Sequence, residues 1–234
     1  MEDPNQAIYE FLSHKLITHQ SAFTNTQGIP VIFKNLYDQL RNTNLEAYEH
    51  KIYTELKTNC RHWWTNKKEG INNAEGLDAI LFEHDWYLFI KDLEANAYGI
   101  IDWKDSGTYS AHFDMGFEYD FAQNFESHPG ITLTLYNELQ VLDPSLLPSE
   151  MLEKDIHEYP GYQDLVSLYT FTNYITVHKA LRRFVETPEF KKISRNPQFL
   201  FIIQQHDGFY STPVWNCIEN KPEGFLSRLK KRLF

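Results

Sequence analysis

The chain of 234 residues has little cysteine and little glycine, and both shortages exclude classes of protein. Two cysteines are too few for a disulfide framework or a cysteine-rich zinc module. The ten glycines form neither of the two glycine-rich loops that hold phosphates, and no Gly-x-Ser-x-Gly elbow is present. We therefore expect no cofactor, and we expect Cys60 and Cys217 to be buried, reduced thiols.

Long apolar runs and basic charge are scarce as well. The longest runs, Trp86–Ile90 and Phe199–Ile203, are far shorter than the roughly 18 residues that suggest a membrane-spanning helix. Near the start stand Glu2 and Asp3, where a secretory signal would be basic. The formal net charge of −10 argues against binding duplex nucleic acid or an anionic membrane surface. These features predict a cytoplasmic protein that binds neither nucleic acid nor membrane.

The negative charge is concentrated in about a quarter of the chain. Between Glu75 and His128 the sequence has twelve acids and two bases, whereas the remainder holds twenty of each. Charge gathered in this way creates a local field that can steer a basic partner or hold a cation. The alternative is that these acids are spread over several solvated faces.

The first part of the chain, residues 1–66, has the spacing of helices. Asp3 and Pro4 suit the cap and the first position of a helix. Apolar residues then recur at helical intervals, and a turn at 25–30 separates the first helix from two more. We expect the second helix to include Ile32–Leu40 and the third to span Leu45–Trp63.

Residues 77–234 predict a sheet with further helices. Short apolar runs indicate strands at Ala79–Phe82, Trp86–Ile90 and Tyr98–Trp103, and an alternating pattern indicates a half-solvated strand at Tyr109–Tyr119. We expect a mainly antiparallel sheet over about 79–119. Helices are expected at Ile131–Leu142, briefly from Ser149, and at Asp164–Glu186, which is apolar nearly all round and should be central.

A hairpin at 199–216 has the clearest local signal, because Asp207-Gly208 stands between two apolar runs. That turn places Gln204 opposite Ser211, His206 opposite Phe209 and Ile202 opposite Pro213. Proline cannot donate to a strand ladder, so the second strand should lie at an edge or break there. The hairpin should join the sheet around the long helix, which gives a single α+β domain over residues 1–234.

Histidines and acids suggest one possible catalytic centre. The cluster comprises His112, Asp114, Glu118, Asp120, Glu126 and His128. Oxygen ligands with imidazoles would suit manganese, iron or zinc, and several of these side chains would share one face of a strand. The dipeptides His84-Asp85 and His206-Asp207 are weaker candidates, because neighbours on a strand point to opposite faces.

The leading hypothesis is a non-catalytic, immunity-type protein that uses an acidic, aromatic surface to neutralise a basic toxin or effector enzyme. In bacteria, small acidic proteins without catalytic motifs often have this role. The predicted partner-binding residues are Asp102, Asp105, Asp114, Glu118, Asp120, Glu126, Trp103, Tyr109 and Tyr119. Aromatic side chains next to acids suit a protein interface, since they bury large area with few rotors to immobilise. The alternative is a metal-dependent hydrolase that uses the 112–128 cluster.

Overall fold

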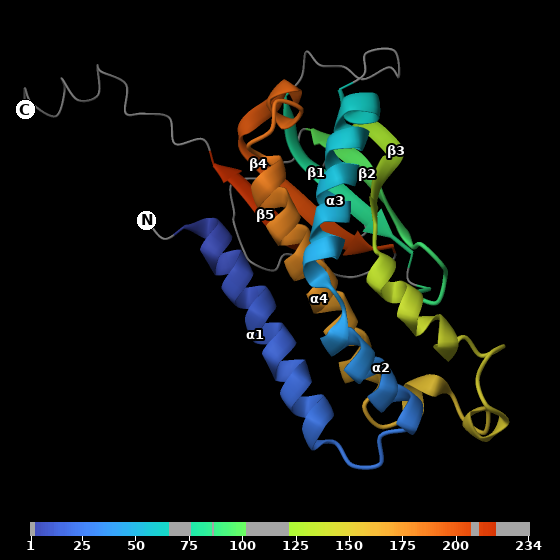
Figure 1. The fold of residues 1–234 in the computed structure, drawn as a ribbon. Coiled ribbons are helices and arrows are strands. Elements are labelled where there is room, and N and C mark those ends of the chain that lie inside the picture. The colour runs from blue at the N-terminus through green and yellow to red at the C-terminus, as the bar shows by residue number, and fades with distance from the viewer. Residues whose placement is uncertain (1–2, 66–75, 86, 102–121, 207–210, 219–234) are drawn as a thin grey trace, which may run out of the picture.

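The structure, a computed structural model, describes residues 3–65, 76–85, 87–101, 122–206 and 211–218 (Figure 1). It confirms the predicted α+β class: helices pack on one face of a five-stranded sheet. In the described part of the chain, no helix combines the length and apolarity that a bilayer crossing requires.

The three N-terminal helices form where their spacing predicts. They are α1 (Pro4–Asn25), α2 (Val31–Asn42) and α3 (Leu45–Asn59), and α3 runs into the π-helical turn η1 (Cys60–Trp64). The Asp3 carboxylate accepts the Asn5 N–H at 3.0 Å and so caps α1. Cys60 is buried, which raises the pKa of its thiol to about 12 and leaves it unreactive, whereas Cys217 is only half-buried.

The sheet has the strand order β3-β2-β1-β4-β5. Its strands are β1 (Leu77–His84), β2 (Glu94–Ile101), β3 (Ala122–Thr132), β4 (Arg195–Gln205) and β5 (Ser211–Ile218). The central pair, β1 with β4, is parallel and the other three pairings are antiparallel. The prediction of a mainly antiparallel sheet is therefore confirmed, but its one parallel pair was not foreseen.

The predicted hairpin register is confirmed where the structure describes it. Gln204 pairs with Ser211 and Ile202 with Pro213, while the predicted pairing of His206 with Phe209 lies outside the described residues. As expected from Pro213, β5 lies at the edge of the sheet and its register with β4 shifts beside that residue.

One prediction beside β2 is wrong. A strand was expected at Trp86–Ile90, but residues 88–92 form turns between β1 and β2. The chain reverses there because Asp85 accepts the Tyr87 N–H at 2.9 Å and Asp92 adopts a left-handed φ of 52°. Trp86 lies outside the described residues, as does the predicted strand at Tyr109–Tyr119.

The predicted helix at Ile131–Leu142 begins later than expected and is a 3-10 helix, η3 (Thr134–Leu142). Residues up to Thr132 belong to β3, which the sequence did not predict because it contains Pro129 and Gly130. Gly130 is required there, since a Cβ atom would meet the Ala95 carbonyl oxygen at 2.1 Å. Further 3-10 turns are η4 (Ser149–Met151), η5 (Ile156–Glu158) and η6 (Phe190–Lys192).

The long helix α4 (Tyr162–Phe184) is central, as predicted, and packs against α1, α3 and the sheet (Figure 1). Several of its buried polar residues are hydrogen-bonded, among them Asn173 and His178. Asn173 is 0% exposed, accepts the Tyr48 O–H at 2.6 Å and donates to the Tyr169 carbonyl at 3.1 Å. This hydrogen bond fixes α3 against α4 inside the core.

We expect Tyr48→Phe to lower the free energy of unfolding by about 1–3 kcal/mol, because the Asn173 carbonyl oxygen then loses its donor inside the core. Tyr53→Phe on the same helix is the control. Tyr53 is half-buried and meets Lys57 and Arg183 through its ring, which phenylalanine retains, so we expect a change within about 0.5 kcal/mol. Urea unfolding measures both, and equal effects would contradict a special role for the hydroxyl.

Candidate functional site

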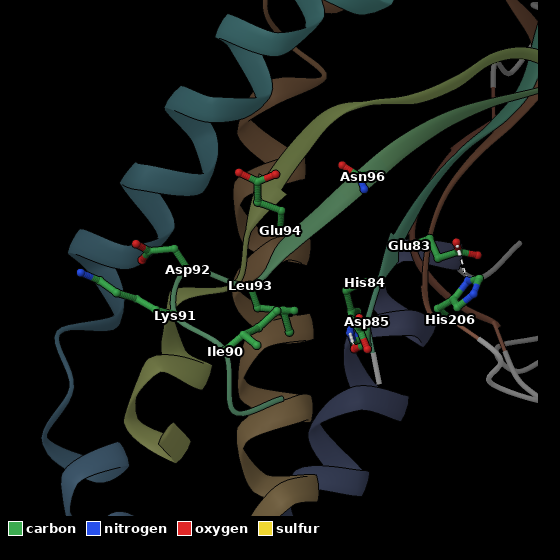
Figure 2. A pocket seen from close by; sticks show the side chains of 10 residues that line it. All are labelled: Glu83, His84, Asp85, Ile90, Lys91, Asp92, Leu93, Glu94, Asn96 and His206. Carbon is green, nitrogen blue, oxygen red and sulfur yellow. Dashed lines mark hydrogen bonds and ion pairs between the residues drawn. The ribbon is translucent and has the colours of Figure 1, made fainter. Parts of the chain in front are cut away.

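An open cleft of about 540 Å³ lies at the edge where β1 and β4 end (Figure 2). Because these strands are parallel, their carboxyl ends reach the same edge of the sheet. The His206 N–H donates to the His84 carbonyl at 2.7 Å and so brings the two ends together. Clefts at the carboxyl ends of parallel strands are a common place for ligands to bind.

Four carboxylates line the cleft, together with a single lysine, Lys91. The carboxylates belong to Glu83, Asp85, Asp92 and Glu94. Asp85, Asp92 and Glu94 are exposed, and Figure 2 shows Glu83 paired with His206, whose Nδ1 lies 2.9 Å from the carboxylate. Among the described residues, no lysine or arginine pairs with any of the four. The cleft therefore has a surplus of negative charge open to solvent.

Hydrogen bonds hold two of these carboxylates in place, one within the chain between β1 and β2 and one from η3. Asp85 accepts the Tyr87 N–H, as described above. The Asp92 carboxylate accepts from the side-chain amide of Asn137 at 2.9 Å, and the Asp92 backbone N–H donates to the Asn137 side-chain oxygen at 2.6 Å. Both carboxylates are thus oriented before any ligand arrives, which lowers the ordering cost of binding.

His84 is the buried group of the cleft, with 3% of its surface exposed. Its Nδ1 lies 2.8 Å from the Asp85 carbonyl oxygen, which can only accept, so Nδ1 carries the proton. Burial lowers the pKa of His84 and keeps the imidazole neutral at neutral pH. Nε2 is then an acceptor, and it is buried with no hydrogen-bond partner among the described residues.

Hydrogen-bond acceptors thus outnumber donors in the cleft. The four carboxylates and His84 Nε2 accept, whereas Lys91, His206 and the amide of Asn96 donate. Such a set is complementary to an ammonium or guanidinium group, which only donates. In the part of the chain that the structure describes, no three histidine, cysteine or acidic side chains converge closely enough to hold a metal ion.

All but one of the predicted partner-binding residues lie outside the described part of the chain. Outside the described residues lie Asp102, Trp103, Asp105, Tyr109, Asp114, Glu118, Tyr119 and Asp120. Glu126 is on β3, but its side chain is not among those described. Of the predicted metal cluster, only His128 has a described side chain, and its ring stacks on Trp63 with centroids 5.8 Å apart. The interface at these residues and the alternative metal site both stay predictions.

His84-Asp85 and His206-Asp207 were the weaker candidates in the sequence, and the structure brings His84, Asp85 and His206 together in the cleft. Glu83, Asp92 and Glu94 were counted in the acidic stretch but were not chosen as site residues. The signal that could have selected them was the position of Glu83-His84-Asp85 at the end of a buried strand. Its significance depends on the parallel partner β4, which is more than a hundred residues later in the chain.

Comparisons with known proteins identify no relative of this chain. No protein-family model matches the chain, and neither the curated proteins nor the solved structures searched contain a match. The geometry and charge of the cleft are therefore what a functional argument has to use.

The lowered pKa of His84 makes stability depend on pH. Below about pH 6.5 the unfolded chain takes up a proton at His84 that the folded chain resists, so the free energy of unfolding falls as the pH falls toward the folded-state pKa. We expect His84→Asn, whose amide can still donate to the Asp85 carbonyl, to flatten this dependence by up to about 1.4 kcal/mol per pH unit.

Urea unfolding at about pH 7 and about pH 5 measures this effect. His14→Asn is the control, because His14 is exposed on α1. The His14 variant should keep the wild-type slope. If both variants have the same slope as the wild type, protonation of His84 does not destabilise the fold.

Proposed function

We propose that the protein is a non-catalytic binding module of the immunity type, which neutralises a basic toxin or effector enzyme. The observation that supports this most directly is the cleft itself, where four carboxylates face solvent or a histidine with no lysine or arginine partner among the described residues. These carboxylates belong to the acidic stretch between Glu75 and His128 that carries the net charge of the chain.

The mechanism we propose is electrostatic and steric. An enzyme that acts on a polyanion such as a nucleic acid carries lysines and arginines in its active site. Oriented carboxylates of an inhibitor attract such a surface at long range, accept bidentate hydrogen bonds from arginine at contact, and block the entry of substrate. The inhibitor needs no catalytic group, which agrees with the lack of catalytic motifs in the sequence.

The first test asks whether the cleft binds cationic side chains. We expect Asp85→Asn combined with Glu94→Gln to weaken binding of a fluorescent nona-arginine peptide by about tenfold, since each exposed ion pair contributes about 0.2–1 kcal/mol. Fluorescence anisotropy with the full chain at about 50 mM and about 300 mM NaCl measures this, and salt should weaken wild-type binding.

The matched control removes the same two charges elsewhere. Glu153 and Glu186 are exposed and do not line the cleft, so Glu153→Gln with Glu186→Gln should change the affinity less than about twofold. Equal weakening by both pairs would show that only net charge matters and would remove the cleft from the proposal.

The second test concerns the partner. Affinity capture at low salt should recover a basic enzyme, encoded next to this protein, whose activity the purified chain inhibits. Failure to bind any protein from its host would contradict the inhibitor proposal. Metal analysis of protein purified without chelator tests the hydrolase alternative, for which bound metal and a thermal shift with Mn²⁺ or Zn²⁺ would be the supporting result.

A further inference from the structure

A second hollow, of about 430 Å³, lies among the helices and shares no residue with the acidic cleft. Three segments form its walls: α1, the end of α2 with the start of α3, and α4. Its lining is mainly apolar and includes Leu16, Tyr37, Leu40, Leu45, Leu168 and Ile175. We call this hollow the helical groove.

The groove exists because two helical segments flank α4 without closing over it. At one end of α1, Nδ1 of His19 lies 2.9 Å from Asp164, near the start of α4, and at the other end Tyr9 packs against His178. The chain then turns at Gly28, where φ is +73°, and α2 and α3 follow the other side of α4. Figure 1 shows α1 and the α2–α3 segment diverging with α4 between them.

The floor of the groove is one stripe of α4. Its residues, from Leu168 through Thr172 and Ile175 to Lys179, recur at intervals of three and four and share one helix face. At a rise of 1.5 Å per residue the stripe is about 16 Å long. The groove is therefore an elongated trough.

Apolar side chains at this trough are unusually exposed. Ile17 on α1 is 63% exposed and Leu45 at the start of α3 is 38% exposed, and both line the groove. Isolated exposed apolar residues are common, but two on facing walls of an apolar trough form a continuous surface that a ligand can remove from water.

The charge of the groove has one sign. Arg41 and Lys179 line it, and no aspartate or glutamate does. Neither cation pairs with a carboxylate in the part of the chain that the structure describes. Arg41 lies over the Tyr37 ring at 5.7 Å, a contact that orients its guanidinium and leaves its N–H donors available.

We propose that the helical groove binds an amphipathic carboxylate of the fatty-acid class, with the alkyl chain along the α4 stripe and the carboxylate on Arg41. A planar guanidinium matches a carboxylate with two parallel hydrogen bonds. The volume lies in the range of small-molecule sites, about 300–1,000 Å³.

Calorimetric titration of the full chain with dodecanoate, below its micelle concentration, tests this directly. Dodecanoate should bind, and octanoate should bind at least about tenfold more weakly because it buries fewer methylene groups. Dodecyltrimethylammonium has the same chain with a cationic head and should not compete. Equal binding of the two dodecyl compounds would overturn the proposed role of charge.

Variants on one helix locate the headgroup. Arg41→Gln should weaken dodecanoate binding by about tenfold, and Arg41→Lys by less, since lysine keeps the charge and loses the planar fork. Lys34→Gln is the control, because Lys34 is an exposed cation of α2 outside the groove. An unchanged affinity in Arg41→Gln would overturn the assignment of the carboxylate to Arg41.

A separate variant locates the alkyl chain. Ser13 is half-buried on the α1 wall, and Ser13→Phe should fill the trough and abolish binding while the thermal transition stays within a few degrees of the wild type. Retained binding in this folded variant would place the ligand elsewhere. None of these readouts depends on the cationic partner proposed above.

Discussion

Strands β1 and β4 lie side by side and parallel at the centre of the sheet, although more than a hundred residues separate them. This pairing requires a long connection between the two strands. The connection contains β2 and β3, which extend the sheet on one side, and α4, which packs on the helical face. The parallel pairing also brings two carboxyl ends to one edge, where His206 donates to the His84 carbonyl and contacts Glu83. The acidic cleft is a direct consequence.

The fold also depends on hydrogen bonds made by polar groups of the buried helix α4. Asn173 ties it to α3, and Nδ1 of His178 lies 2.8 Å from the Val214 carbonyl of β5. Burial lowers the pKa of His178, so this contact is made by a neutral ring that donates from Nδ1. Because unpaired polar groups in the interior are costly, these bonds specify how α4 sits between the helices and the sheet.

The sequence predicted the features that depend on neighbouring residues. The cap at Asp3, the apolar surface of α4 and the edge position implied by Pro213 each follow from the chemistry of one segment. Strand β3 was missed because its Pro129 and Gly130 resemble a turn, and they fit only because of how β2 lies beside them. The turn at 88–92 was mistaken for a strand because it contains several apolar residues. In the structure these residues do not share one environment, since Leu88 is buried and Ile90 is exposed.

The acidic cleft was missed for a related reason. Its carboxylates lie close together in sequence, so their number and sign were predictable, but the open edge that gathers them depends on β4. The helical groove shows the same limit, since Arg41 and Lys179 belong to different helices and meet one trough only through the packing of α4. Patterns within a segment predict what that segment buries, whereas a binding surface is defined by segments that the fold brings together.

The two surfaces differ in charge as well as in position. Four carboxylates line the cleft at one edge of the sheet, and no lysine or arginine of the described residues pairs with them, which is the arrangement that our proposal of a basic partner requires. The helical groove is lined instead by two cations, Arg41 and Lys179, beside apolar walls. The acidic cleft and the helical groove share no lining residue, so the two ligands that we propose, a basic protein and an amphipathic carboxylate, would occupy separate surfaces.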